Sequence, residues 1–185
     1  MIDRKPGEAD RVDAAGLQAF VNRIVSEHGG EELIFLCIGT DRSTGDSLGP
    51  WVGTLLEDRG VSGVLGTLRI PCDANSLPKL MRTLPEKAVI IAIDACLGRP
   101  ESVGSFLARK GPLVPARSVN GGLEAVGAYS IEGVVNENSL KPYWTLQSTS
   151  LYRVMEMAEQ VADVIANAMR VRGDLRDSVL RRFAR

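Results

Sequence analysis

Short apolar runs alternating with amphipathic stretches predict an α/β fold. Residues 33–38 and 88–93 are continuous apolar runs, the pattern of strands buried on both faces of a parallel sheet. Residues 64–70 predict a strand between them in the chain, and helices are expected over 51–59 and 76–84. This β-α-β-α-β order favours a doubly wound sheet with right-handed crossovers.

The alternation of strand and helix patterns changes in the second half of the chain. Residues 104–109 and 125–135 have the pattern of strands, but a segment rich in proline and glycine joins them without a clear helix. Such a connection favours an antiparallel or irregular edge. A long amphipathic helix follows, capped by Ser148 or Thr149. We therefore predict an α/β, three-layer α/β/α sandwich with a mixed, mostly parallel sheet, similar to phosphorylase/hydrolase-like folds.

The length of 185 residues predicts one domain over 1–185. Residues 1–12 are expected to form a loose N-terminal arm, and residues 173–185 a charged C-terminal tail. The arm is too polar for a signal peptide, and no apolar run is long enough to span a membrane. Three cysteines without CxxC spacing indicate no disulfide framework, which favours a reducing, cytoplasmic compartment.

Charge and composition exclude some classes of binding partner and some kinds of catalytic chemistry. With 22 Lys+Arg against 23 Asp+Glu, the chain has no broad basic field for nucleic acid, and 5% aromatic residues do not favour a base-stacking surface. The single histidine, His28, falls at the expected end of a helix, where capping is its favoured role. Chemistry that needs several histidines is largely excluded, and we expect no cofactor and no bound metal. Two interpretations of Trp51 stay open: a homo-oligomer with a contact through Trp51 and the C-terminal tail, or packing of Trp51 within one subunit.

Aspartates follow each of the early strands. Asp41 and Asp46 lie after the first, Asp73 after the second and Asp94 after the third. If the strands are arranged 2-1-3, the first and third are neighbours, and Asp94 converges with Asp46 or Asp41 at the carboxyl edge of the sheet. Two carboxyl groups at a partly desolvated site do not both ionise readily, so one stays protonated. Such a pair supplies an acid and a base that can activate water against a peptide bond.

Other interpretations of these residues remain open. Aspartate and serine are common in loops and caps. The four aspartates could instead hold a hard cation such as magnesium through oxygen ligands. The loop 39–49 joins a strand to a helix but lacks the lysine and glycine spacing of nucleotide-binding loops. For Cys96, a buried structural thiol is favoured over a nucleophile, because no second histidine is present to activate it.

Two motifs resemble the spore protease YyaC family of endospore-forming bacteria. They are CIGTDRSTGDSLGP at residues 37–50 and IDACLG at residues 93–98. More distantly, the chain is similar to the germination protease (GPR), an atypical aspartic endopeptidase that degrades small acid-soluble spore proteins, and to hydrogenase maturation peptidases. The resemblance implies Asp46 and Asp94 as the catalytic pair, and it selects Asp46 over Asp41.

The resemblance also implies a function in sporulation or germination. We expect an endopeptidase that acts on small acid-soluble spore proteins in the cytoplasm of the forespore or in the spore core. The chain departs from the germination protease at Thr40, where that family has asparagine, and at Gly45, where it has proline. The alternatives are a non-catalytic protein that binds a spore protein or peptide, and a divalent-metal-dependent hydrolase. Candidates for binding substrate or supporting the pair are Asp41, Arg42, Ser43, Thr44, Asp73 and Asn120.

Overall fold

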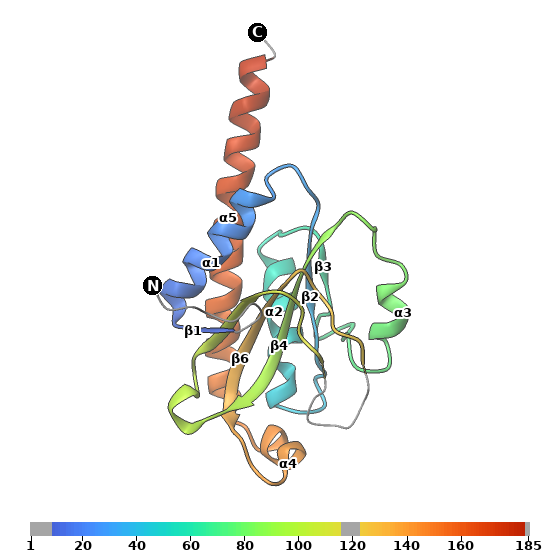
Figure 1. Ribbon diagram of the computed structural model, residues 1–185, viewed down its shortest axis with the longest axis vertical. Helices are drawn as coiled ribbons and strands as arrows, with labels where there is room; N and C mark the ends of the chain where they lie inside the picture. Colours follow the sequence, from blue (N-terminus) through green and yellow to red (C-terminus); the bar gives the residue numbers. More distant parts are fainter. Residues whose placement is uncertain (1–8, 116–122, 184–185) are drawn as a thin grey trace.

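The computed structural model describes residues 9–115 and 123–183, with side chains described as far as residue 173. These residues form a sheet in the order β1-β5-β6-β4-β2-β3 (Figure 1). Strands β2, β3, β4 and β6 are parallel, whereas β5 is antiparallel to β6 and β1 is antiparallel to β5. The bounds are β1 Asp10–Val12, β2 Leu33–Cys37, β3 Val64–Leu65, β4 Val89–Gly98, β5 Phe106–Lys110 and β6 Tyr129–Glu137.

The order β3-β2-β4 confirms the predicted 2-1-3 arrangement of the early strands. The mixed, mostly parallel sheet and the α/β class are also confirmed. The bounds of the strands differ from the prediction, most of all in two strands; β6 also begins four residues later than the expected 125–135. The strand expected over 64–70 has only two residues in β3, and β4 continues to Gly98 because it stays paired with β6. Asp94 therefore lies inside a strand rather than after its end.

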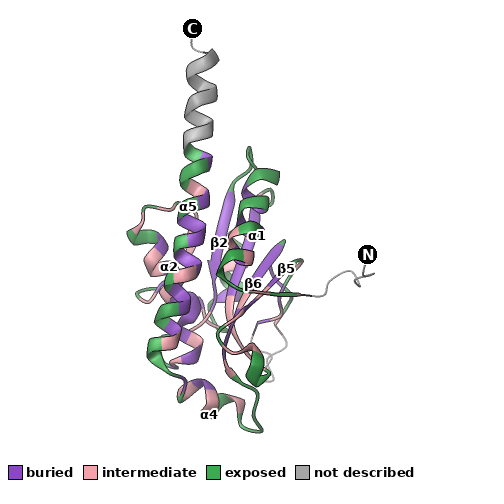
Figure 2. Cartoon of the chain, turned by 90° about the vertical axis from the view of Figure 1, so that its left-hand side faces the viewer, coloured by how far each residue is buried: buried purple, intermediate pink, exposed green. Residues whose placement is uncertain are grey.

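Three helices cover one face of the sheet. They are α1 (Ala14–Glu27), α2 (Leu48–Asp58) and α5 (Leu151–Phe183). Their buried sides pack on alternate residues of the strands in one apolar core (Figure 2), because side chains alternate between the two faces of a strand. Trp51 is partly buried against this core, in agreement with packing inside one subunit. The largest fully buried side chains of this core include Phe35, Leu17, Ile91, Ile131 and Phe106.

The opposite face has a thinner cover. It consists of the short helix α3 (Leu77–Met81) and irregular segments before and after it, and α3 lies apart from the other helices (Figure 1). A second, smaller core lies there, formed by Leu36, Ile38, Cys72, Leu77, Ala92, Leu113 and Val126. The third layer of the expected sandwich is thus mainly loop. This face carries the cavity described below.

The structure differs from the prediction at both ends of the chain and at one helix. Residues 10–12 of the expected loose arm form β1, and α5 continues through most of the expected tail to Phe183. Helix α4 (Pro142–Gln147) was not predicted. Ser148 and Thr149 do not cap α5, because their hydroxyl groups donate to carbonyl oxygens of α4, whereas Ser150 Oγ accepts from the N–H of Arg153 at 3.4 Å.

His28 ends α1, as expected for a capping residue. Its ring lies between Glu31 and the hydroxyl group of Tyr129, each at 2.9 Å. Among the described helices, none is both long and apolar enough to cross a membrane.

Candidate active site

Gly39 brings the loop that carries Asp46 back against the end of β2. Its φ of 141° is a conformation that side chains rarely adopt, and a Cβ atom there would lie 2.0 Å from the carbonyl oxygen of Asp46. The same carbonyl accepts a hydrogen bond from the N–H of Thr40 at 3.2 Å. Glycine at this position therefore sets where Asp46 lies.

Close packing on both sides fixes the short 3-10 turn η1 (Gly45–Ser47). A Cβ atom on Gly49 would lie 2.0 Å from the carbonyl oxygen of Ile38, and one on Gly45 would lie 2.7 Å from the side chain of Leu146 in α4. The turn is thus held between the end of β2 and helix α4. Asp46 is therefore placed by close contacts of its turn on both sides.

Asp94 projects from β4 on the face opposite the main core, the same face as Ala92. Its Oδ1 accepts a hydrogen bond from the N–H of Ala95 at 2.8 Å. Burial raises the pKa of Asp94 well above its ordinary value; the Ala95 hydrogen bond opposes this, and the charges of Asp46 and Glu132 add to it. Asp94 therefore tends to keep its proton.

Burial also raises the pKa of Asp46. The Ser43 hydroxyl is close enough to oppose this shift, although Ser43 Oγ is buried and makes no hydrogen bond of normal geometry within the described residues. Asp46 and Asp94 line one cavity of about 560 Å³. Of the two aspartates that follow β2, Asp46 lines the cavity together with Asp94, whereas Asp41 is exposed and outside the cavity lining.

Arg42 and Asp73 form the rim of the same cavity. Arg42 Nη2 donates to Asp73 Oδ2 at 3.0 Å, and Asp73 Oδ1 accepts from the N–H groups of Asn75 and Ser76, each at 3.0 Å. Burial would raise the pKa of Asp73, but these hydrogen bonds and the Arg42 charge outweigh it and lower the pKa. Asp73 thus fixes the turn before α3 and holds Arg42.

The other residues predicted to bind substrate or to support the aspartate pair are not among the described residues that line the cavity. Ser43 and Thr44 do not line the cavity. The carbonyl oxygen of Thr44 accepts hydrogen bonds from the N–H and hydroxyl groups of Ser47, so Thr44 supports η1. Asn120 lies outside the described residues.

Glu132 and Arg109 were missed by the sequence analysis, yet both line the cavity. Glu132 lies on β6 directly opposite Asp94 on β4, and Arg109 Nη2 lies 3.2 Å from Glu132 Oε2. A signal was present in the sequence, because the segment 130–135 places a charged residue in the middle of an otherwise mostly apolar strand.

Two cysteines border the pair of aspartates. Burial raises the pKa of Cys96, with the charges of Glu132 and Asp94 adding to the effect. Burial likewise raises the pKa of Cys72 to about 11, with the Asp73 charge adding. A thiol with a raised pKa is a poor nucleophile at neutral pH. The raised pKa agrees with the expectation that Cys96 is not a nucleophile, but Cys96 is only partly buried and lines the cavity, so it is not the buried thiol that was expected.

The four aspartates considered as a magnesium site are not arranged as that alternative requires. Asp46, Asp73 and Asp94 border the cavity without Asp41, and Asp73 is engaged by Arg42. Within the described parts of the chain, no three His, Cys, Asp or Glu side chains are grouped closely enough to hold a metal ion.

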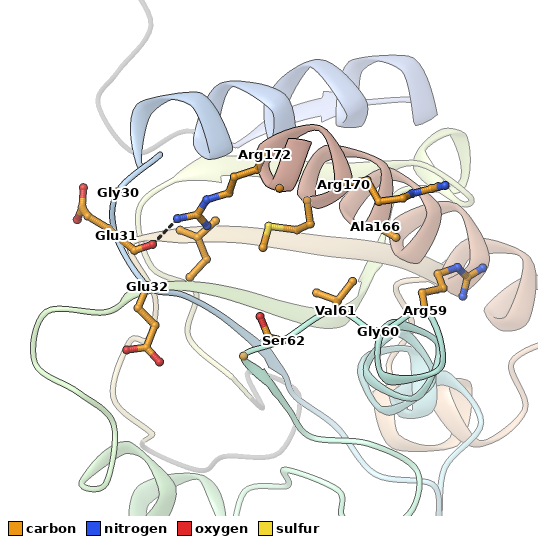
Figure 3. Close-up of a pocket in the computed structure, with 14 residues that line it drawn as sticks. Gly30, Glu31, Glu32, Arg59, Gly60, Val61, Ser62, Ala166, Arg170 and Arg172 are labelled. Atoms are coloured by element: carbon orange, nitrogen blue, oxygen red, sulfur yellow. Dashed lines mark hydrogen bonds between the residues drawn. The ribbon is translucent and has the colours of Figure 1, made fainter. Parts of the chain in front are cut away.

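A second cavity, of about 610 Å³, lies at the opposite edge of the sheet, near the start of β2 and the residues before β3 (Figure 3). Its arginines are engaged by the protein itself. Arg172 donates to the carbonyl oxygens of His28 and Glu31, and Arg59 pairs with Glu159 and Asp163. These contacts join α5 to neighbouring segments.

The fold is that of a mixed α/β protein and is similar to a solved peptidase. The crystal structure of the [NiFe] hydrogenase maturation protease HycI from Thermococcus kodakarensis KOD1 matches with a TM-score of 0.53 and 15% identity, covering 80% of this chain and 99% of that chain. At this identity the match shows the fold alone.

Sequence comparison then gives the family. Residues 8–164 match the family model described as "Protein of unknown function (DUF1256)", and the chain belongs to this family. It is also 41% identical over 159 residues to "Uncharacterized protein YyaC" of Bacillus subtilis (strain 168), across 83% of this chain and 78% of that protein. The resemblance to YyaC is therefore confirmed.

Proposed function

We propose that this protein is an endopeptidase in which Asp46 and Asp94 activate water for hydrolysis of a peptide bond. The observation that carries the proposal is that two carboxyl groups from different elements line one cavity, each with its pKa raised by burial. Clustered carboxyl groups with raised pKa values in a cavity are typical of catalytic sites. The peptidase fold of the maturation protease supports the same class of reaction.

The two aspartates take different roles in the proposed reaction. Asp94, whose pKa burial raises well above the ordinary value, carries the proton. Asp46 ionises first and accepts a proton from water, whose oxygen attacks the carbonyl carbon of the peptide. Asp94 donates its proton to the carbonyl oxygen, which gives a tetrahedral diol. Asp46 then passes the proton that it took from water to the leaving nitrogen as the carbon–nitrogen bond breaks, and one hydroxyl group of the diol returns a proton to Asp94. The products are a carboxylic acid and an amine.

The cavity offers both polar and apolar contacts to a peptide. Leu97, Leu107 and Val114 line it together with the charged groups. Apolar walls around a few convergent polar groups are usual for binding sites of small ligands and peptide segments. The resemblance to the germination protease supports small acid-soluble spore proteins as the substrate class, with action in the forespore or spore core.

The test is mass spectrometry of purified small acid-soluble spore proteins incubated with wild-type protein, Asp46→Asn, Asp94→Asn and Asp58→Asn. Asp58 is the matched control, since it is an exposed aspartate at the far end of α2. We expect cleavage by wild type and Asp58→Asn, and a loss of about 10²-fold or more in each of the other two. Undiminished cleavage by Asp46→Asn or Asp94→Asn would reject the proposal.

Two further experiments distinguish the proposed peptidase from a binding protein and from a metal-dependent hydrolase. If wild type retains a spore protein in a pull-down but produces no cleavage product, the chain is a binding protein on a peptidase fold. If cleavage is lost with a chelator and restored by magnesium, the reaction depends on a divalent cation. Cleavage that persists in the chelator supports the aspartate pair acting alone.

A further inference from the structure

Charged side chains from three neighbouring strands form a row on the cavity side of the sheet. Asp94 on β4 and Glu132 on β6 are direct partners in the parallel pairing. Arg109 on β5 lies two residues from Leu107, the antiparallel partner of Glu132, and so on the same face. The order across the sheet is Asp94, Glu132, Arg109, so that Glu132 separates the cation from Asp94.

The ion pair between Arg109 and Glu132 is sheltered from solvent. The two side chains are 17% and 16% exposed, and their charged atoms are 3.2 Å apart. Sheltered ion pairs add little net stability, because the lost hydration of both ions offsets their attraction. Arg109 Nε is buried and has no hydrogen-bond partner among the described residues. Arg109 Nη1 also donates to the carbonyl oxygen of Pro112 at 3.4 Å, which ties the end of β5 to the following loop. Both Arg109 and Glu132 line the cavity, so they are placed to act on the groups in it as well.

We propose that Glu132 and Arg109 are positioning residues for the aspartate pair: Arg109 fixes the Glu132 carboxylate beside Asp94, and this carboxylate keeps Asp94 as the proton donor. Asp46 is then left as the base. The inference rests on the proposed function, since donor and base are roles in that reaction.

Charged and titratable groups border Asp94 from several elements. Burial is the main cause that raises the pKa of Asp94, the Ala95 N–H opposes it, and the charges of Asp46 and Glu132 add to it. Of these two acids, Glu132 has no step of its own in the reaction, so its charge acts only through Asp94. The other charged or titratable groups around it are Arg42, Asp73, Cys96 and Arg109, which line the same cavity, and Cys72, whose pKa is raised by burial and also by the Asp94 charge.

The decisive variant is Glu132→Gln, which keeps the shape of the side chain and removes its charge. We expect the Asp94 carboxyl, followed by carbon-13 NMR, to titrate at a lower pH than in wild type. We also expect the alkaline limb of the kcat/KM profile to move to lower pH. On that limb kcat should fall by about tenfold with little change in KM, which is a part of the about 10²–10⁴-fold effect of a positioned acid or base.

Glu137→Gln is the matched control, because Glu137 is exposed at the end of the same strand. It should leave both the titration and the pH profile unchanged. Arg109→Gln should lower kcat by leaving Glu132 without its cation, and Arg109→Lys should restore part of it. The double variant Arg109→Gln/Glu132→Gln carries neither charge and serves where a single variant does not fold.

The outcomes distinguish this inference from the proposed function. If Glu132→Gln is folded and neither the Asp94 titration nor the pH profile moves, the positioning role is rejected. If wild type cleaves no protein but the Asp94 titration moves down in Glu132→Gln, the peptidase proposal fails and the coupling of Glu132 to Asp94 is supported.

Discussion

Asp94 and Glu132 lie side by side as direct partners of two adjacent parallel strands, β4 and β6. Arg109 contacts Glu132 on the side away from Asp94. Burial and the charges of Asp46 and Glu132 raise the pKa of Asp94, so that ionising Asp94 in the folded protein costs free energy. Both residues line the cavity, which links their electrostatics to the proposed chemistry.

Asp94→Asn is expected to be more stable than wild type at neutral pH. Because burial raises the pKa of Asp94, the folded state binds its proton more tightly than the unfolded chain does. The stability of wild type from this group is fully present below the ordinary carboxyl pKa of 3.8 and is lost as the pH rises toward the raised folded value. The free energy of unfolding, measured with urea at several pH values across this range, should change less with pH in Asp94→Asn than in wild type. The same pH dependence in both proteins would contradict the assignment.

Gly39→Ala is expected to damage both stability and activity. Its Cβ atom would lie 2.0 Å from the Asp46 carbonyl oxygen, so the loop must shift. Gly60→Ala is the control, because Gly60 also has a positive φ, of 73°, but nothing lies within 4 Å of its added Cβ atom. The control should lose about 1–2 kcal/mol from backbone strain alone and keep full cleavage. Gly39→Ala should lose more stability and cleave at least about tenfold more slowly, since a displacement near 1 Å can cost about 10²-fold. Equal losses in both variants would show that the close approach to Asp46 is unimportant.

Asp73→Ala is expected to destabilise the turn before α3 by about 1 kcal/mol, because two N–H groups lose their acceptor. Asp73→Asn keeps an acceptor oxygen and loses only the charge opposite Arg42, so its loss should be smaller. Since the pKa of Asp73 is lowered, its stabilising effect is present above the ordinary value of 3.8 and declines as the pH falls through the folded value. Thermal unfolding of the three proteins at neutral and acid pH measures this order, and equal destabilisation by Asn and Ala would contradict it.

Tyr129→Phe is expected to lower the free energy of unfolding by about 1 kcal/mol without changing cleavage. The ring is buried, and its hydroxyl donates to Glu27 at 2.9 Å and lies 2.9 Å from His28 Nε2. This cluster is at the start of β6, away from the aspartate pair. A loss of activity that exceeds the loss of folded protein, measured by activity per folded molecule, would contradict this separation.

The apolar runs predicted β2 and β4 correctly because both strands are buried in the centre of the sheet, where local sequence and environment agree. The end of β4 was placed too early, since the apolar pattern breaks at Asp94. The strand continues because β6 pairs with it as far as Gly98, and a partner that is distant in the chain leaves no local mark. β3 is short for the converse reason: only two of its residues find partners on β2.

The residues of the candidate site likewise fall into those that the sequence could predict and those that it could not. The common strand order 2-1-3 predicts that Asp94 lies near Asp46 or Asp41, because it brings the ends of neighbouring strands together. The choice of Asp46 comes from the family resemblance and not from the strand order. Arg109 could not be predicted, because its contact with Glu132 depends on the antiparallel register of β5 and β6. The role of α4 was also missed, since its contact with Gly45 joins segments about a hundred residues apart.

The unequal cover of the two faces of the sheet has a practical consequence for protein engineering. The large core under α1, α2 and α5 shares no buried residue with the smaller core under α3. None of the described residues that α1 and α5 contribute to the larger core lines the cavity of the aspartate pair. The packing of these two helices can therefore be redesigned to stabilise the protein without replacing a residue of that cavity.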